Sequence, residues 1–174
     1  AVILEKIKQF DFRSVLEVGC AAGANIYRIK EAFPHADVGG LDWNEDAIKA
    51  AKTMLPRALV IQVGEANDIY ISTKGTDILL SDMCYIYLGK KDFRKAIKEA
   101  KRATRIGVVF CEFNETKWWR RLLIKLSTGY NSYDYRKELK KAGFHDIEIQ
   151  KLTPKEWPGT EKENGLRAII TARP

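Results

Sequence analysis

Short apolar segments alternate with segments of helical periodicity, and this order constrains the fold more than any other feature of the sequence. Apolar runs bounded by turn residues predict buried strands, and apolar residues spaced three and four apart predict helices packed on them. Five strands are expected in the first part of the chain, at 14–18, 38–41, 58–63, 77–80 and 106–110. Helices are expected between them, at 25–33, after the capping residue Asn44, and at 91–102. Such alternation predicts a parallel sheet with helices on both faces.

The C-terminal part of the sequence departs from this alternation. A helix is expected at 133–142, closed by Gly143, and two more strands at 147–152 and 166–171. The segment 153–164 between these strands has no helical period, and a connection without a helix favours antiparallel pairing. The sequence therefore predicts an α/β fold whose seven-stranded, mostly parallel sheet ends in an antiparallel strand.

Charge and composition narrow the class of protein. The first 89 residues carry a net charge of −3 and the remaining residues +10, which suggests an anionic partner for the second half. Much of this positive charge lies on one predicted segment, 90–105. An ordinary solvent-exposed helix face explains the charge there as well as an anionic partner does. No run of 18 apolar residues predicts a membrane span, and the N-terminal segment is too short and charged for a secretory signal. The sequence contains three scattered cysteines, which predict a reducing, cytoplasmic location and no metal site.

The segment 17–23, Glu-Val-Gly-Cys-Ala-Ala-Gly, joins the first strand to the first long helix. Small residues there let backbone N–H groups and the helix N-terminus approach a ligand closely. Asp42 ends the second strand, where an acidic side chain accepts hydrogen bonds from ribose hydroxyls. NAD and a sulfonium nucleotide both suit such a site. Glu17 favours the sulfonium nucleotide over NAD, because a carboxylate repels a pyrophosphate and attracts an ammonium or sulfonium group.

These residues resemble the motifs of class I, Rossmann-like S-adenosylmethionine-dependent methyltransferases. The segment 17–23 resembles the first motif, with Ala21 in place of its middle glycine, and 40–44, 63–66 and 77–82 resemble the next three. The resemblance covers nearly the whole chain and implies one methyltransferase domain over 1–174 that binds S-adenosylmethionine and releases S-adenosylhomocysteine. It implies cofactor contacts from Glu17, Gly19, Cys20, Ala21, Gly23, Asp42, Trp43, Glu65, Ala66 and Ser81.

The resemblance also implies a role for each motif. Asp42 binds the ribose diol, Glu65 and the backbone N–H of Ala66 recognise the adenine edge, and the fourth motif faces the methionine end. Two interpretations of Trp43 stay open, a ring beside the adenine and an aromatic of the core.

Catalytic candidates come from the carboxyl ends of the parallel strands, where ligands of such sheets bind. Asp82 and Glu112 follow the fourth and fifth strands and are the expected catalytic residues, although Asp82 is also suited to capping a turn. Both histidines, His35 and His145, precede strands and belong to the opposite edge, so we expect no histidine base. Cys84 is a candidate nucleophile, but the Pro-Cys pair of cytosine-C5 methyltransferases is absent.

The acceptor side is expected to include Tyr85, Asn114, Trp118, Trp119 and Trp157, with Tyr87 as a second pocket tyrosine. The insertion 114–131 carries an amphipathic segment, 118–126, that leaves the fifth strand at the ligand edge. Together with the segment 153–164 it predicts a lid that excludes water from the acceptor. A helix packed on the sheet and a helix on a membrane surface are the alternatives.

Three functions fit this sequence. The first is methyl transfer to an O or N atom of a small molecule, which requires positioning and desolvation more than a conspicuous catalytic motif. The second is methylation of RNA or another nucleic acid, with phosphates bound by Arg120, Arg121, Lys125 and Arg136. The third is a non-catalytic module that binds the cofactor or a partner.

Overall fold

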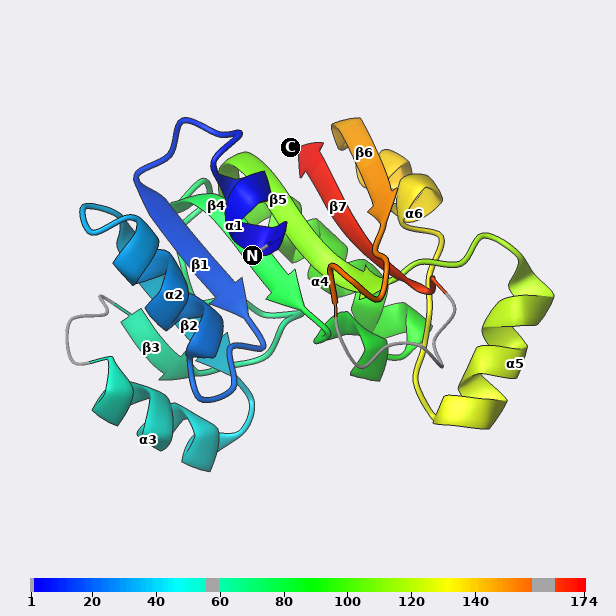
Figure 1. The fold of residues 1–174 in the computed structure, drawn as a ribbon, viewed down its shortest axis with the longest axis horizontal. Helices are drawn as coiled ribbons and strands as arrows, with labels where there is room; N and C mark the ends of the chain where they lie inside the picture. The colour runs from blue at the N-terminus through cyan, green and yellow to red at the C-terminus, as the bar shows by residue number, and fades with distance from the viewer. Residues whose placement is uncertain (1, 56–59, 158–164) are drawn as a thin grey trace.

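A computed structural model describes residues 2–55, 60–157 and 165–174. Its centre is a seven-stranded sheet in the order β3-β2-β1-β4-β5-β7-β6. The strands are β1 (Ser14–Val18), β2 (Asp37–Asp42), β3 (Val60–Val63), β4 (Thr76–Asp82), β5 (Thr104–Phe113), β6 (His145–Lys151) and β7 (Arg167–Arg173). The helices are α1 (Val2–Ile7), α2 (Ala24–Ala32), α3 (Glu45–Met54), α4 (Lys90–Ala103), α5 (Trp118–Thr128) and α6 (Tyr135–Lys141), with a short 3₁₀ helix η1 at Tyr85–Tyr87 (Figure 1).

The predicted sheet topology is confirmed. Strands β1 to β5 pair in parallel, and β7 pairs antiparallel with both β5 and β6. Asn44 caps α3 as expected, because its side chain accepts hydrogen bonds from the backbone N–H groups of Asp46 and Ala47. Gly143 follows α6 with φ +86°, the left-handed conformation that ends many helices. Residues 58 and 59 of the predicted third strand lie outside the described residues.

The structure differs from the prediction at one helix boundary and at one helix that was not expected. The helix predicted from 133 begins at Tyr135, because Asp134 accepts a hydrogen bond from the backbone N–H of Lys137 and caps it. Helix α1 was not predicted. Six residues are too few for a stable helix in isolation, and its buried Ile3 and Ile7 show that packing on the sheet supports it.

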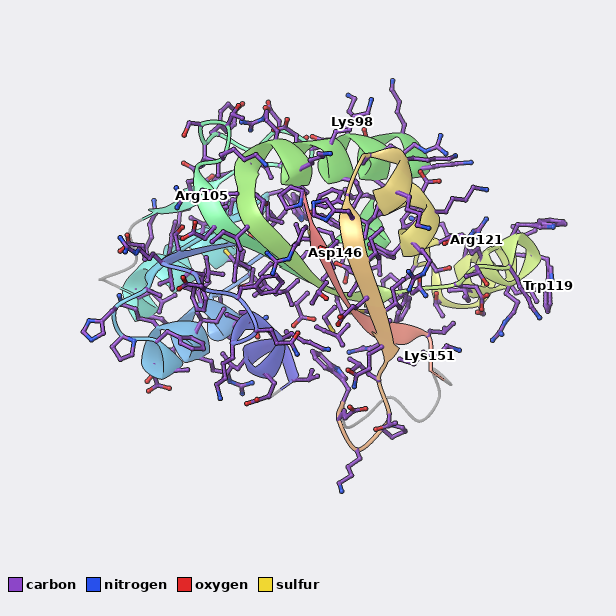
Figure 2. The ribbon with its side chains drawn as sticks, turned by 90° about the horizontal axis from the view of Figure 1, so that it is seen from above. Lys98, Arg105, Trp119, Arg121, Asp146 and Lys151 are labelled. Atoms are coloured by element: carbon purple, nitrogen blue, oxygen red, sulfur yellow. The ribbon has the colours of Figure 1, made fainter. Side chains whose placement is uncertain are left out.

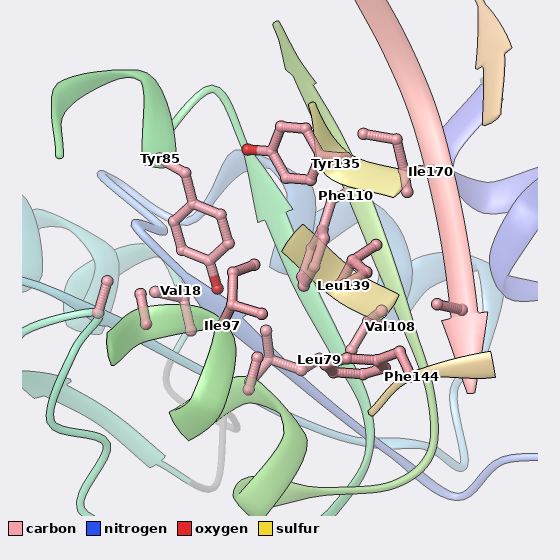
Figure 3. Packing of buried hydrophobic residues seen from close by; sticks show 14 of the residues in the cluster. Val18, Leu79, Tyr85, Ile97, Val108, Phe110, Tyr135, Leu139, Phe144 and Ile170 are labelled. Atoms are coloured by element: carbon pink, nitrogen blue, oxygen red, sulfur yellow. The ribbon is translucent and has the colours of Figure 1, made fainter. Parts of the chain in front are cut away.

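The helices cover the sheet on both faces. Helices α4 and α6 lie on one face, and α1, α2 and α3 lie on the other (Figures 1 and 2). Aromatic rings fill the first face, where Tyr85 contacts Phe110 at 5.3 Å between ring centroids and Tyr135 contacts Phe93 at the same separation (Figure 3). These rings are fully buried, so they fix the direction in which η1 leaves β4.

Helix α5 stands apart from this three-layer body (Figure 1). Ile124 is the buried residue of the helix, and it packs in a small cluster with Ile86 and Phe113. The helix ends at Gly129, whose φ of +78° and backbone hydrogen bond to Lys125 close its last turn. Helix α5 is therefore held to the body by one side chain and by the chain segments at its two ends.

Candidate functional site

A cavity of about 440 Å³ opens at the carboxyl ends of the central parallel strands. This edge is where open parallel sheets bind their ligands, and the volume lies within the range of small-molecule sites. The turn after β1, the end of β2, the segment after β3 and the segment from β4 through η1 all contribute. The cavity is lined by Gly19, Ala21, Leu41, Asp42, Trp43, Gly64, Glu65, Ala66, Asn67, Asp82, Met83, Cys84, Tyr87 and Leu88.

The turn after β1 is shaped by its backbone. The N–H groups of Gly19 and Cys20 both donate to the carbonyl oxygen of Leu41, at 2.8 and 3.0 Å. Gly19 has φ +75°, and a Cβ placed on it would lie 2.4 Å from Cβ of Cys84. A side chain at this position would be strained and would collide with the chain that follows β4. Glycine therefore lets two strand ends approach each other beside the cavity.

Asp42 connects the turn to the second strand. Its Oδ2 accepts a hydrogen bond from the backbone N–H of Ala21, and its Oδ1 accepts one from Asn44, both at 2.9 Å. The side chain is nearly buried yet lines the cavity. A carboxylate offers about four acceptor positions, so Asp42 keeps acceptor capacity for a ligand while its orientation is fixed from two sides.

Two acidic side chains lie together at the site, and one amide joins them: Asp82 lines the cavity, whereas Glu17 lies beside it and does not. The Nδ2 of Asn25 donates to Oε1 of Glu17 at 2.8 Å and to Oδ2 of Asp82 at 3.0 Å. The second oxygen of each carboxyl group, Oε2 and Oδ1, is buried without a hydrogen-bond partner. Burial raises the pKa of Glu17 to about 8, and burial also raises that of Asp82. Unpartnered carboxylate oxygens at low exposure suit a cationic ligand group, which would supply the missing donors and favour the ionised forms.

The part of the cavity that follows β2 and β3 includes exposed side chains. Trp43 lines it with 79% of its surface exposed, so the interpretation of Trp43 as a core aromatic is wrong. Glu65 is exposed at the rim, and Ala66 is buried beside it. An exposed indole beside a cavity is available for stacking on a flat ring.

Known proteins with related sequences identify the family. The profile of a family described as "methyltransferase domain" matches residues 15–107, more than half of the chain. This chain belongs to the methyltransferase-domain family. The matched segment includes every residue that lines the cavity.

Two curated relatives show how far the similarity extends. Trans-aconitate 2-methyltransferase of Afipia carboxidovorans is 26% identical over 83 residues, which cover 48% of this chain and 32% of the relative. The 2-methyl-6-phytyl-1,4-hydroquinone methyltransferase 2 of Oryza sativa is 27% identical over 153 residues, 85% of this chain and 43% of the relative. The chain thus spans less than half the length of either relative.

A solved structure confirms the fold of this methyltransferase domain. Phosphoethanolamine N-methyltransferase 2 of Haemonchus contortus, solved with S-adenosyl-L-methionine, superposes with a TM-score of 0.75 at 15% identity. The superposition covers 99% of this chain and 52% of the other. The expected class I, Rossmann-like methyltransferase fold is therefore correct.

Glu112 has a different task in the methyltransferase domain from the catalytic one expected of it. It is fully buried, and its Oε1 accepts hydrogen bonds from Oγ of Ser81 and from the backbone N–H groups of Cys84 and Tyr85, at 2.7 to 3.0 Å. Burial raises its pKa to about 7. Glu112 therefore holds the start of η1, Ser81 donates to it, and neither residue lines the cavity.

Other expected site residues also belong to the packing of the domain. Tyr85 lies in the aromatic core, and Oδ1 of Asn114 accepts a hydrogen bond from the backbone N–H of Tyr135. Cys20 is buried behind the turn, and Gly23 is the N-cap residue of α2, with φ +84°. These positions shape the surroundings of the cavity without lining it.

Cys84 does line the cavity, but its chemistry excludes the nucleophile interpretation. Burial raises the pKa of its thiol well above the usual value, and the nearby Glu112 adds to the shift. A thiol in this state holds its proton and is a poor nucleophile. No group of His, Cys, Asp and Glu suited to a metal ion occurs within residues 2–55, 60–157 and 165–174.

The tryptophans expected to cover the acceptor do not share one cavity. Trp118 and Trp119 project from α5 with 71% and 48% of their surfaces exposed, and neither lines the main cavity. Trp157 lines a separate hollow with residues of α1 and α2, among them Asn25, and the guanidinium of Arg167 lies 5.1 Å over its ring. In this structure α5 is thus not a lid, because it leaves the body beyond β5. The rest of the expected lid, 158–164, lies outside the described residues.

Both histidines lie where the sequence predicted. His145 begins β6 and His35 precedes β2, both exposed at the edge of the sheet opposite the cavity. Sequence reasoning missed Asn25, Met83 and Leu88. Only Asn25 carried a signal, since an amide in the first turn of the helix after a glycine-rich turn is well placed to contact neighbouring acids. Within the described part of the chain, no helix is long and apolar enough to cross a membrane.

Proposed function

We propose that the chain is an S-adenosylmethionine-dependent methyltransferase that acts on an O or N atom of a small molecule. One observation carries the proposal: a single cavity is lined by Asp42, a fixed acceptor, and by Asp82, which Asn25 joins to Glu17 beside the cavity, and Asp82 and Glu17 each keep one unpartnered carboxyl oxygen. A nucleoside that carries a cationic amino-acid tail needs both features. NAD has no cation for Glu17, and its pyrophosphate would be repelled there.

The residues present fit this cofactor. Asp42 receives the ribose diol, Glu65 and the N–H of Ala66 face the adenine edge, and Trp43 stacks beside the ring. Glu17 and Asp82 hold the ammonium group, with Asn25 keeping the two carboxyl groups in place. The bound cofactor supplies a methyl group on a sulfonium, which is already activated for displacement.

The chain then has to position the acceptor and exclude water. Met83, Cys84 and Leu88 give the cavity an apolar wall next to Asp82, which suits this task. A strong base is not required, because the sulfonium leaves as a neutral thioether. Asp82 precedes Met83 at this wall. Where the acceptor carries a proton, we propose that Asp82 receives it, and that Glu17 alone then holds the ammonium group.

A small-molecule acceptor is favoured over a nucleic acid by two observations. Both curated relatives are named for low-molecular-weight acceptors. The basic residues expected to bind phosphates are also partly engaged: Arg120 pairs with Glu115 at 3.0 Å, and Arg121 and Arg136 donate to backbone carbonyl groups.

Calorimetric titration tests the proposal. S-adenosylmethionine and S-adenosylhomocysteine should bind in the micromolar range, and Asp42→Ala should weaken binding by about 1–3 kcal/mol through lost hydrogen bonds to the diol. Asp37→Ala, at the opposite end of the same strand, is the matched control and should leave the affinity unchanged. Binding of NAD without binding of either sulfur nucleotide would refute the proposal.

Turnover is tested separately. Methyl transfer from labelled S-adenosylmethionine to a panel of small carboxylic, phenolic and amine acceptors should give a product that Asp42→Ala loses. Transfer to structured RNA in place of every small acceptor would replace the small-molecule assignment with the nucleic-acid one. Cofactor binding without transfer to any acceptor would favour a binding module.

A further inference from the structure

Helix α5 exposes more apolar surface than any other helix of the described chain. Five of its side chains are large, apolar and at least 48% exposed: Trp118, Trp119, Leu122, Leu123 and Leu126, at 71, 48, 53, 55 and 74%. Apolar residues scattered singly on a surface are ordinary, whereas a contiguous group on one helix marks an interaction site. The cavity described above does not use this group.

These five residues form one stripe, which we call the α5 face. At 100° per residue they span less than half of the helix circumference, and Ile124 lies on the opposite side, toward the body. Figure 2 shows α5 at one end of the molecule, with Trp119 at its outer limit and Arg121 closer to the body. The helix thus packs on the rest of the protein through the side that carries Ile124, and the α5 face points outward.

Cationic side chains border the α5 face. Lys117, Arg121 and Lys125 lie on or next to the helix, and the sequence from 116 to 133 contains no Asp or Glu. A fourth cation, Arg120, pairs with Glu115, which precedes the helix, at 3.0 Å. Lys125 Nζ donates to the carbonyl oxygen of Gly129 and Arg121 to that of Thr116, so neither charge is neutralised by these contacts. An apolar stripe with tryptophans, bordered by Lys and Arg, has the distribution of helices that lie in the interface of an anionic bilayer.

We propose that the α5 face docks on an anionic phospholipid bilayer. The tryptophan and leucine side chains enter the boundary between headgroups and acyl chains, and the bordering cations contact lipid phosphates. Docking of this kind is reversible and does not require a membrane-spanning helix. The proposal is independent of the methyl acceptor and of cofactor binding.

Charge decides against a second copy of the chain as the occupant. Two α5 faces packed together would bring their cationic borders close, and neither helix supplies an acidic partner. A nucleic acid would satisfy the cations but would leave the large apolar stripe against a polar backbone. A bilayer with anionic headgroups can bury the apolar side chains and also contact the cations beside them.

The test is co-sedimentation of the full chain with vesicles. We expect binding to vesicles of phosphatidylcholine mixed with phosphatidylglycerol and much weaker binding to phosphatidylcholine alone. Leu122→Asp/Leu126→Asp should weaken binding to the mixed vesicles by at least about tenfold, because it places charge in the apolar stripe. Both positions are exposed, so folding, checked by circular dichroism, should be retained.

Met54→Asp/Tyr70→Asp is the matched control. It adds the same two negative charges at exposed apolar positions outside α5 and should bind the mixed vesicles like the parent chain. Equal loss of binding in both double variants would show that only the net charge of the protein matters, and this would overturn the proposal. Absence of vesicle binding would overturn it too, as would a concentration-dependent dimer or an RNA complex that Leu122→Asp/Leu126→Asp abolishes.

Discussion

The chain segments around the cavity and helix α5 are built in opposite ways. Around the cavity, backbone groups at the ends of β1, β2 and β4 and at the start of η1 bond to one another and to Asp42 and Glu112. Helix α5 contacts the body through Ile124 and exposes its larger side chains. The walls of the cavity are thus bonded to one another, whereas most side chains of α5 contact little of the protein, and we expect α5 to tolerate substitution at most positions.

This difference teaches where sensitivity to mutation should lie. A cavity that must orient a charged ligand gains from rigid, mutually bonded walls, because the ligand then finds its partners in place. A docking surface needs only the right distribution of apolar and charged groups. Substitutions that look alike in sequence should therefore differ widely in effect between the two regions.

The largest contrast is expected for two glycines with nearly equal φ, Gly19 at +75° and Gly129 at +78°. Gly19→Ala combines backbone strain with a collision at Cys84 and should lower the free energy of unfolding by about 2–5 kcal/mol. Gly129 has no neighbour within 4 Å of an added Cβ, so Gly129→Ala should cost only the strain, about 1–2 kcal/mol. Urea denaturation of both variants measures the difference. Equal losses would show that the turn after β1 is not closely packed.

The buried carboxyl group of Glu17 makes stability depend on pH. Its pKa rises from 4.5 in the unfolded chain to about 8 on folding, so between these values the folded chain holds a proton that the unfolded chain has released. Without ligand, the free energy of unfolding should fall as pH rises through this window, by up to about 1.4 kcal/mol per pH unit. Glu17→Gln should remove this contribution. Urea denaturation at pH values spanning the window measures it.

Two controls accompany the measurement on Glu17. Glu112, with its pKa raised to about 7, contributes in the same direction, so the slope in Glu17→Gln should decrease without vanishing. Leu126→Gln on α5 should keep the full slope. Identical slopes in the parent chain and Glu17→Gln would mean that Glu17 is already ionised in the folded, ligand-free protein.

A smaller effect, and of opposite sign, is expected from Ala21→Gly, which should raise the free energy of unfolding. Ala21 stands where the related motif has glycine, and its φ of +46° is left-handed. Glycine relieves the strain but adds freedom to the unfolded chain, which leaves a net stabilisation of about 0.5–1 kcal/mol. The affinity for S-adenosylmethionine should persist, because Asp42 accepts from the backbone N–H at this position. A destabilised variant would mean that the Ala21 methyl group makes a contact worth more than the strain.

The smallest effect is expected at the outer side of α5. Leu126→Gln should change the free energy of unfolding by no more than about 0.5 kcal/mol, because Leu126 is 74% exposed. Ile124→Ala, two residues earlier, removes the buried anchor and should cost about 2 kcal/mol. Thermal unfolding of the two variants compares them directly. A large loss in Leu126→Gln would mean that the α5 face is already covered in solution.

The sequence by itself determined the order of strands and helices, the antiparallel last strand and the edge of the sheet where a ligand binds. These features follow from local periodicity and from the handedness of strand-helix-strand connections, which one sequence expresses directly. The positions of Asp42 and the glycine-rich turn follow for the same reason, since each ends or follows a strand at the ligand edge. The placement of both histidines was predictable on the same basis.

Only the tertiary structure decided what the other side chains do. Glu112 and Asp82 look alike in sequence, since each follows a buried strand. Each keeps one buried oxygen without a partner, but three donors bind the other oxygen of Glu112 away from the cavity lining, whereas Asp82 lines the cavity. The amphipathic pattern of α5 likewise predicted a helix with an apolar side, but not whether that side faces inward. Such outcomes depend on contacts between residues far apart in the chain, and local sequence patterns carry no record of those contacts.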